Sequence, residues 1–321
     1  MKSLVLKPGR VLMSEFGKTV HSRPDKVDAL LGSTLMASLD KLDIVARKIF
    51  SGKTQGERRS RRRGMSVEFA DYRQYTSGDD LRFIDWNVYA RLDKLFMKIF
   101  LEEEELTLGI AIDASASMEF GNPNKFDFAR RLAMALGYIA LSSHNKVSLF
   151  SFNDQGVKRL SALRGRKRTR DVGQWLLDLM PQGGTAFVDA CKTISTARQG
   201  RGVLVVVSDC FDIEGTKQGL SYLVGGGWDV FVMQVLSPEE INPLRAGLEG
   251  DLRLEDSETT DTCEITVTAP LIDKYMQRLQ SHCEQIREQC KRVGAGNVKV
   301  STDIDMEQLL VEYLRSRGLL R

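Results

Sequence analysis

The sequence has little cysteine and no long hydrophobic run, and each of these two shortages excludes a class of protein. The five cysteines among 321 residues are odd in number and form no CxxC pair, which argues against a disulfide framework and against a zinc ribbon. The longest apolar stretches, around 134–141 and 203–207, are far shorter than the roughly 18 to 20 residues that span a bilayer. We therefore expect no transmembrane helix.

The first 20 residues also lack the continuous apolar segment of a secretory signal. They are interrupted by Lys7, Pro8, Arg10, Glu15 and Lys18, whereas a signal peptide needs an unbroken hydrophobic region. Together with unpaired thiols, this predicts a cytoplasmic protein.

An excess of charge of one sign is also missing, although the charges are unevenly distributed. Lys and Arg number 46 and Asp and Glu 43, so the net charge of +3 does not by itself indicate nucleic acid or a membrane surface as a partner. Residues 1–64 contain 15 basic and 6 acidic side chains, which leaves 31 and 37 for the rest. The sequence thus predicts a basic N-terminal arm on a mildly acidic body.

Three regions follow from the pattern along the chain. Residues 1–64 are predicted to form an amphipathic helix over 28–50, with leucines at three- to four-residue spacing, and a five-arginine linker over 51–64. Residues 65–105 are predicted to pack on the body, and residues 106–321 to form the main domain. We expect the N-terminal helix to pack on that domain as well.

Strand and helix patterns alternate in the main domain, which is typical of a parallel sheet covered on both faces. A turn at 153–156 predicts that strand 157–160 returns antiparallel at the edge. The fold class is therefore α/β, a mostly parallel sheet with one antiparallel edge strand and helices on both faces, plus the N-terminal helical and basic segment. The expected strands are 106–113, 146–152, 157–160, 203–207, 228–236 and 298–300; the expected helices are 124–142, 167–179, 187–198 and 270–294, with one more between 209 and 228 and another from 306; a hairpin is expected at 251–255 and 263–268.

Oxygen-bearing side chains follow two of these strands. Asp113, Ser115 and Ser117 form a DxSxS sequence directly after the first strand, and Asp209 follows strand 203–207. Ligands bind at the carboxyl ends of strands in such sheets, where Thr185, after a Gly-Gly pair, is a natural complement. These five oxygen ligands suit Mg²⁺. Ser and Asp are also common turn formers, so a capped loop is the structural alternative for DxSxS alone.

This set resembles the metal-ion-dependent adhesion site of von Willebrand factor A-type domains, in order and in position. The resemblance implies that Ser115, Ser117 and Thr185 coordinate Mg²⁺ directly or through water, and that Asp113 and Asp209 act largely through water. Mn²⁺ and Ca²⁺ stay open as alternatives. It also implies that a protein partner supplies a carboxylate to the metal.

A second resemblance lies just before the DxSxS strand. The segment from Tyr75 to Trp86, YTSGDDLRFIDW, followed by Ala90-Arg91, Lys98 and the acidic run 102–105, is similar to a bacterial family known as domain of unknown function fifty-eight. Members pair a von Willebrand A-like domain with this segment and are typically encoded beside MoxR-type AAA+ ATPases. Many carry N-terminal membrane helices, which this chain lacks. A fixed ion-pair network of Asp79, Asp80, Asp85 and Arg82 is the structural interpretation of the segment.

The predicted function is a non-enzymatic, Mg²⁺-dependent protein-binding module, an adaptor or partner of a MoxR-type AAA+ ATPase in assembly or remodelling of a protein complex. No catalytic residue is predicted, because His21, His144 and His282 lie in no nucleophile elbow or HExxH pattern.

Two alternatives stay open. A metal-dependent hydrolase would need a general base, for which Glu119 and Asp212 are the nearest candidates. A nucleic-acid-associated protein would use the arginines of 58–63, although no aromatic residues interleave them.

Overall fold

The computed structural model describes residues 10–11, 26–40, 42, 44, 68–101, 106–197, 202–243, 250–255, 262–315 and 319–320. The contacts within the chain divide it into two units, one of residues 1–48 with 106–321 and the other of residues 49–105. The predicted linker over 51–64 lies outside the described residues. The boundaries of the three predicted regions, and the packing of 65–105 on the body, stay predictions.

The larger unit is built on a six-stranded sheet in the order β11-β8-β7-β4-β5-β6. All neighbouring pairs are parallel except β5 and β6, which pair antiparallel at the edge. The three central strands β4, β7 and β8 are buried along their whole length, as their continuous apolar sequences require. The strands are β4 (Thr107–Asp113), β5 (Lys146–Asn153), β6 (Gly156–Arg164), β7 (Gly202–Ser208), β8 (Asp229–Leu236) and β11 (Gly296–Ser301). The predicted fold class is confirmed.

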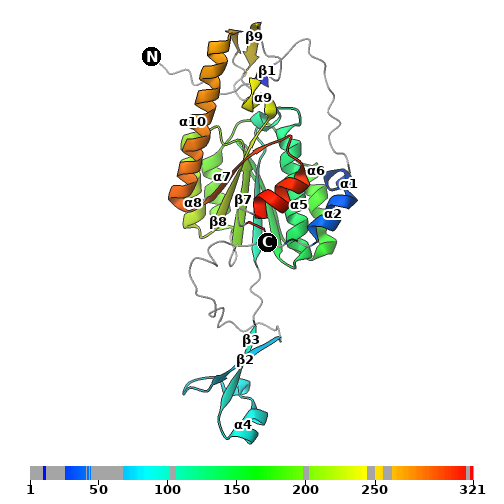
Figure 1. Cartoon of the computed structure of the whole chain (residues 1–321), viewed down its shortest axis with the longest axis vertical. Helices are drawn as coiled ribbons and strands as arrows, with labels where there is room; N and C mark the ends of the chain where they lie inside the picture. The colour runs from blue at the N-terminus through cyan, green and yellow to red at the C-terminus, as the bar shows by residue number, and fades with distance from the viewer. Residues whose placement is uncertain are drawn as a thin grey trace. The chain divides into compact units, whose positions relative to one another are not determined.

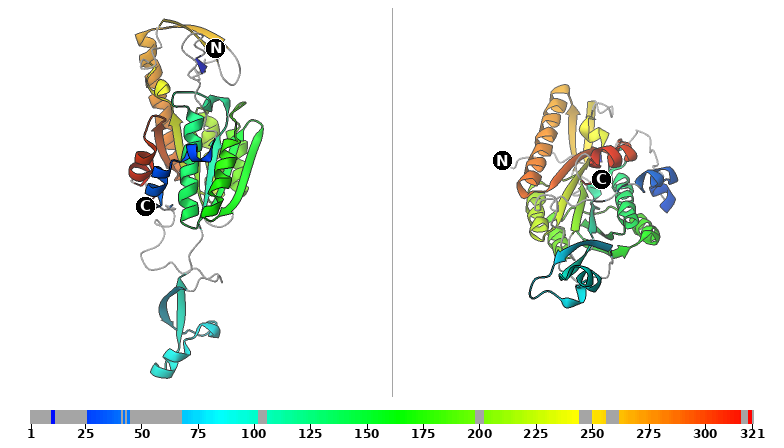
Figure 2. Two further views of the ribbon diagram at one scale, coloured as in Figure 1. Left: turned by 90° about the vertical axis from the view of Figure 1, so that its right-hand side faces the viewer. Right: turned by 60° about the horizontal axis from the view of Figure 1, so that its bottom comes forward.

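Helices cover both faces of this sheet (Figures 1 and 2). One face carries α5 (Lys125–Ser142) and α6 (Thr169–Leu177), and the other carries α7 (Phe187–Thr196), α8 (Ile213–Gly225) and α10 (Ala269–Val293). Helix α5 begins as the sequence predicts, because the Asn124 side chain accepts hydrogen bonds from the amides of Phe126 and Asp127 at 2.9 and 3.1 Å.

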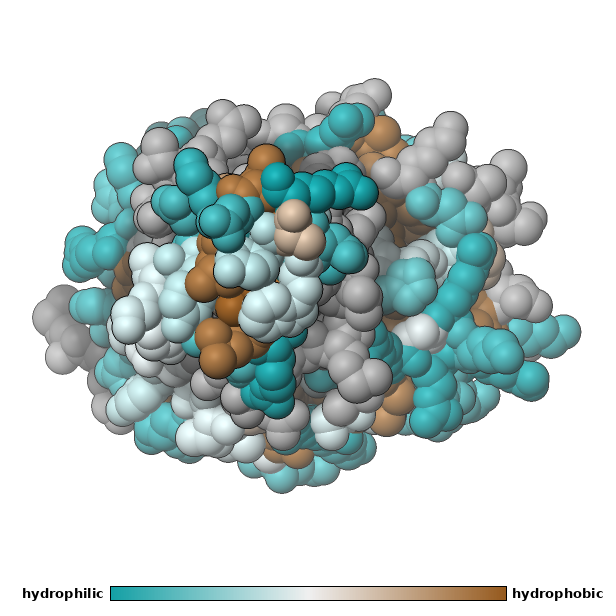
Figure 3. Space-filling view, turned by 90° about the horizontal axis from the view of Figure 1, so that it is seen from below, coloured by the Kyte–Doolittle hydropathy of each residue, from teal (hydrophilic) through white to brown (hydrophobic). Residues whose placement is uncertain are grey.

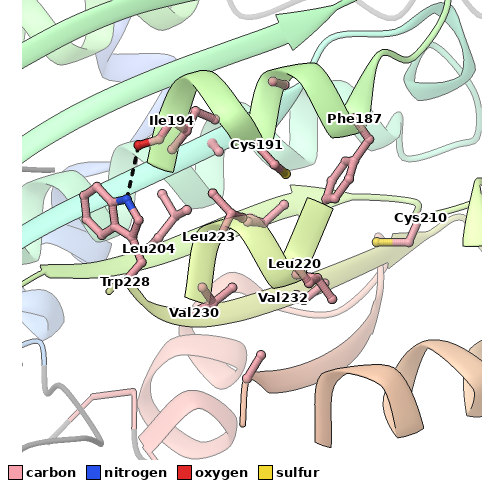
Figure 4. Close-up of a cluster of buried hydrophobic side chains, with 14 of the residues drawn as sticks. Phe187, Cys191, Ile194, Leu204, Cys210, Leu220, Leu223, Trp228, Val230 and Val232 are labelled. Carbon is pink, nitrogen blue, oxygen red and sulfur yellow. Dashed lines mark hydrogen bonds between the residues drawn. The ribbon is translucent and has the colours of Figure 1, made fainter. Parts of the chain in front are cut away.

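A hydrophobic cluster fills the space between β7, β8 and the helices α7 and α8 (Figure 4). The Trp228 indole is 1% exposed, and its Nε1 donates a hydrogen bond to the carbonyl of Ile194 at 3.2 Å. Gly202 makes room for this ring, since a Cβ there would lie 2.5 Å from Trp228 Cζ3. The core is thus fitted to one large side chain at its centre.

The expected single helix over 28–50 is wrong. Two short helices, α1 (Val27–Leu30) and α2 (Ser33–Leu39), occupy its first part, separated by extended backbone at Leu31 and Gly32. Leu30, the last residue of α1, and Leu31, in the break, are both buried. Residues 45–50 lie outside the described residues.

The N-terminal helices do pack on the larger unit, as predicted. Helix α1 contacts α6, and α2 contacts α5. The Tyr138 hydroxyl donates a hydrogen bond to Asp40 Oδ1 at 2.6 Å, and Ile44 forms a bridge with Leu320. The N-terminal and C-terminal parts of the chain therefore meet on this unit.

The remaining elements of the larger unit follow the predicted order. The expected hairpin is β9 (Gly250–Glu255) with β10 (Thr262–Val267), and the short β1 (Arg10–Val11) adds to β9. Helix α9 (Pro238–Ile241) follows β8, and α11 (Met306–Gln308) continues into a π-helical turn, Leu309–Leu314. Within the described residues, no helix combines the length and apolar character needed to cross a membrane.

The smaller unit is a hairpin with a short helix. Strands β2 (Glu68–Gln74) and β3 (Phe96–Leu101) pair antiparallel and enclose a 3₁₀ turn, η1 (Leu81–Phe83), and α4 (Trp86–Leu92). Asp85 joins these parts: its Oδ1 accepts from the amides of Asn87 and Val88, and its Oδ2 accepts from the Tyr72 hydroxyl at 2.9 Å and lies 3.1 Å from Lys98 Nζ.

The predicted ion-pair network of this unit is a set of separate pairs. Arg82 pairs with Asp80 at 2.6 Å, whereas Asp79 pairs with Arg73 at 2.7 Å and Asp85 pairs with Lys98. The expectation named the right carboxylates but missed their partners Arg73 on β2 and Lys98 on β3, the two strands that flank these carboxylates.

Large apolar side chains are concentrated on the surface of the smaller unit. It carries six of the nine exposed large hydrophobic residues found among the described parts of the chain: Tyr72, Leu81, Phe83, Trp86, Tyr89 and Leu92. Figure 3, which is seen from below, shows brown side chains gathered between pale and teal ones. Trp86 and Tyr89 contact each other edge to face, with ring centroids 6.1 Å apart.

Candidate metal and protein-binding site

The candidate ligands lie at the carboxyl ends of the two central strands. Asp113 ends β4, Ser115 and Ser117 lie in the following loop and its 3₁₀ turn η2 (Ala116–Met118), and Asp209 follows β7. Thr185 lies on the loop before α7. The DxSxS loop and the Thr185 loop are joined by backbone hydrogen bonds of 2.8 Å, from the amide of Ala116 to Gly183 and from that of Gln182 to Ala114.

Gly183 permits the bend that brings the Thr185 loop to the site. Its φ is +71°, a conformation that favours glycine, and a Cβ there would lie 2.2 Å from Asp154 Oδ1. The Asp154 carboxylate accepts a hydrogen bond from the amide of Gly184 at 2.8 Å. The Gly-Gly pair therefore has the conformational role that the sequence predicts, with Gly183 as the residue that requires it.

Asp113 is fully buried and fixed at both oxygens. Its Oδ1 accepts from the amide of Ser115 at 3.0 Å, and its Oδ2 accepts from the Ser208 hydroxyl at 2.7 Å. Burial and the nearby Asp209 carboxylate raise the pKa of Asp113 to about 7. The Ser115 and Ser117 hydroxyls lie 3.0 Å apart.

This donor set fits a hard divalent cation. It consists of two carboxylates and three hydroxyls, and oxygen is the ligand that Mg²⁺ prefers. Burial, and after it the Asp209 carboxylate, raises the pKa of Asp113, so a cation bound beside the two carboxylates would stabilise their charged forms. No group of three or more His, Cys, Asp or Glu side chains suited to a metal occurs in the described parts of the chain.

The structure brings most of the predicted site together. Asp113, Ser115 and Ser117 share one hydrogen-bonded loop, and Asp209 lies within electrostatic reach of Asp113. Thr185 lies two residues beyond Gly183, on the loop bonded to the DxSxS loop. Ser117 and Thr185 are half-buried, whereas Asp113, Ser115 and Asp209 are buried. The hydroxyl side of the site is therefore the side open to solvent.

Two charged residues beside Asp209 were missed by the sequence analysis. The Lys125 ammonium is fully buried and lies 3.0 Å from Asp209 Oδ2 and 2.6 Å from Glu240 Oε1. Burial acts to lower the pKa of Lys125, but Asp209 and Glu240 outweigh it and hold that pKa above the usual value of a lysine. Burial raises the pKa of Glu240, an effect that Lys125 partly offsets.

Both residues leave a signal in the sequence. Lys125 shares the apolar stripe of α5 with Phe128 and Leu132, and a lysine on such a stripe needs a carboxylate partner. Glu240 completes a capping box with Ser237: the Ser237 hydroxyl accepts from the Glu240 amide, and Glu240 Oε2 accepts from the Ser237 amide at 2.7 Å.

The family of the chain follows from a match that includes this site. The family model described as "protein of unknown function DUF58" matches residues 71–285. The chain belongs to the DUF58 family. The match covers the smaller unit, from the middle of β2 onward, together with all five candidate ligands.

Relatives of similar length occur in mycobacteria. An uncharacterised protein of Mycobacterium tuberculosis and another of Mycobacterium bovis are each 24% identical to this DUF58 protein over 289 residues. The alignment covers 88% of this chain and 90% of each relative.

Solved structures that are similar to this DUF58 protein include two proteins of other kinds. The VWA domain of SpRpn10 aligns with a TM-score of 0.39 and 14% identity, over 65% of this chain and 94% of the domain. The pilus adhesin SpaC from Lactobacillus rhamnosus GG aligns with a TM-score of 0.42 and 11% identity, over 68% of this chain and 30% of the adhesin. We base the fold class on the strand order and not on these scores.

Other polar residues near the site in this DUF58 protein have structural partners. Asp212 caps α8 by accepting from the amide of Gly215 at 3.0 Å, and His282 Nε2 lies 2.9 Å from the carbonyl of Cys210. Burial lowers the pKa of His282 and raises that of the Cys210 thiol. Cys210 is buried in the hydrophobic cluster between β7, β8, α7 and α8, so its thiol serves packing.

Proposed function

We propose that this chain is a non-enzymatic protein-binding module that binds Mg²⁺ at Asp113, Ser115, Ser117, Thr185 and Asp209. The observation that carries the proposal is that the DxSxS loop after β4 is hydrogen-bonded to the loop of Thr185, while Asp113 accepts from Ser208 at the end of β7 and lies near Asp209.

The binding mode follows from the charges of the site. When bound, Mg²⁺ supplies a positive charge that attracts a carboxylate of a protein partner. Asp113 and Asp209 would hold the ion as buried ligands, and Ser117 and Thr185, which are half-buried, would be the ligands nearer to solvent. Such a site recognises an acidic side chain without needing a general base.

The finer proposal concerns the partner and the location. We propose a cytoplasmic adaptor or partner of a MoxR-type AAA+ ATPase, acting in assembly or remodelling of a protein complex. The reason for this choice of partner is the resemblance of the segment around Asp85 to a family whose members are typically encoded beside MoxR-type ATPases. In this proposal, the external carboxylate belongs to the ATPase or to its substrate.

Mg²⁺ titration by calorimetry on the full chain tests the site. Wild type is expected to bind Mg²⁺, and Ser117→Ala is expected to weaken binding at least about tenfold through loss of one oxygen ligand. Ser221→Ala, an exposed serine on α8, is the matched control and is expected to bind as wild type does. A wild type that binds no divalent cation would refute the metal site.

Capture of a MoxR-type AAA+ ATPase from the same organism, in Mg²⁺ or in EDTA, tests the partner. We expect the purified ATPase to be retained by wild type in Mg²⁺ only, and not by Ser117→Ala. Equal retention in EDTA would show that recognition does not pass through the metal. No retention in either condition would remove the ATPase from the proposal while leaving the metal site intact.

A further inference from the structure

Four charged groups are buried together beside the candidate metal site. Asp113 and Lys125 are 0% exposed, and Asp209 and Glu240 are each 3% exposed. Charges in such a place are screened little by solvent, so each strongly affects the affinity of the others for a cation. Asp113 and Asp209 are candidate ligands, whereas Lys125 and Glu240 have no role in the function proposed above.

Lys125 is held in one position by its surroundings. Its ammonium bonds Asp209 Oδ2 and Glu240 Oε1, and it lies 5.1 and 5.9 Å from the ring centroids of Phe211 and Phe120. The aromatic rings exclude water from the ammonium. Asp209 is thus anchored through one carboxylate oxygen by a fixed cation.

Glu240 is fixed independently of the metal site. Its second oxygen belongs to the capping box with Ser237, and its carbonyl accepts from the Tyr275 hydroxyl of α10 at 3.0 Å. The turn that carries it also meets the loop after the DxSxS motif, where Glu239 Oε1 accepts from the amide of Asn122 at 3.1 Å. Glu240 therefore has a defined place beside Lys125.

We propose that Lys125 and Glu240 are positioning residues of the metal site, in which Lys125 anchors Asp209 and Glu240 cancels the charge that this anchor introduces. The inference rests on the function proposed above. Without Glu240, the ammonium would neutralise half of the charge that Asp113 and Asp209 offer to a divalent cation. With Glu240 present, the cluster keeps two net negative charges, which match one divalent ion.

The charge relation between Lys125 and Glu240 predicts the direction in which Mg²⁺ affinity changes when the second substitution is added. Packing alone predicts a different direction. Glu240→Gln leaves Lys125 uncompensated, and Mg²⁺ affinity is expected to fall about tenfold or more. Adding Lys125→Met to that variant removes the uncompensated charge, so the double variant is expected to bind Mg²⁺ more tightly than Glu240→Gln alone. If the two residues served packing only, the second substitution would weaken binding further or leave it unchanged.

The experiment is Mg²⁺ calorimetry on the full chain, with thermal unfolding of the metal-free variants to show that they are folded. Gln can replace Glu in a capping box, which favours folding of Glu240→Gln. The control applies the same substitutions to an exposed pair, Glu214→Gln and Glu214→Gln/Lys217→Met on α8, whose side chains lie 3.9 Å apart. These controls are expected to bind Mg²⁺ as wild type does.

The outcomes separate this inference from the proposed function. Recovery of affinity in the double variant supports the charge relation. Wild type that binds Mg²⁺, with Glu240→Gln unchanged or with a double variant that binds no more tightly than Glu240→Gln, overturns the inference and leaves the metal site standing. Wild type that binds no Mg²⁺ overturns both.

Discussion

At the scale of single residues, Asp85 shows how one carboxylate organises the smaller unit. It caps α4, accepts from Tyr72 on β2 and pairs with Lys98 on β3. Burial acts to raise its pKa, but the bonds from Tyr72, Lys98 and the amides of Val88 and Asn87 lower the pKa to about 2. Because the folded-state pKa lies below the unfolded value, Asp85 stabilises this unit above about pH 4, and the stabilisation is lost as pH falls through 2.

Asp85→Asn is expected to remove this pH dependence. The amide still caps α4, but it carries no charge for Lys98, so this unit should be less stable than wild type at pH 7 and equally stable near pH 2. Backbone amide NMR signals of residues 86–92, followed from pH 7 to pH 2 in the full chain, measure the effect. Trp86→Ala is the neighbouring control, since its side chain is 60% exposed and its loss should leave the acid transition in place. An unchanged acid transition in Asp85→Asn would contradict the assignment.

At the scale of elements, Gly183 connects loop conformation to the metal site. Gly183→Ala is expected to destabilise the chain by about 1–2 kcal/mol from the positive φ alone, with a further cost from the contact with Asp154. Because the loop also carries Thr185, Mg²⁺ affinity should fall in the same variant.

Gly156→Ala is the control that separates the cost of a positive φ from the cost of the contact with Asp154 in Gly183→Ala. Gly156 has a φ of +119° in the β5–β6 turn, but a Cβ there meets nothing within 4 Å. The Gly156→Ala variant should be less stable than wild type, as measured by chemical denaturation, and should bind Mg²⁺ as wild type does. If Gly183→Ala bound Mg²⁺ as wild type does, the Thr185 loop would not belong to the site.

Elements with a strong local pattern are the ones that the sequence predicted well. The apolar runs of β4 and β7 have to be central strands, and Asn124 begins α5 by side-chain bonds to its own helix. The helix over 28–50 was wrong because the backbone is extended at Leu31 and Gly32, between two short helices that pack on α6 and α5. Tertiary packing of this kind leaves no mark in local spacing.

The same distinction applies to the site. Asp113, Ser115 and Ser117 lie within five residues, so a loop motif reveals them, and Asp209 follows a recognisable strand. Lys125 and Glu240 are 115 positions apart and meet only because α5 and α9 both adjoin the carboxyl edge of the sheet. Lys125 is recognisable as a lysine on an apolar stripe, and Glu240 as part of a capping box. Neither pattern indicates that the two residues contact each other.

At the scale of the whole molecule, the division into two units predicts that damage to one leaves the other folded. Gly202→Ala places a Cβ 2.5 Å from the Trp228 ring and is expected to cost the larger unit about 1–3 kcal/mol by overpacking. Hydrogen exchange in the full chain should then quicken across β7 and β8 and stay unchanged in residues 68–101, because each unit has its own internal contacts. Asp85→Asn should give the reverse pattern. Faster exchange in both units from either variant would show that the two fold as one cooperative body.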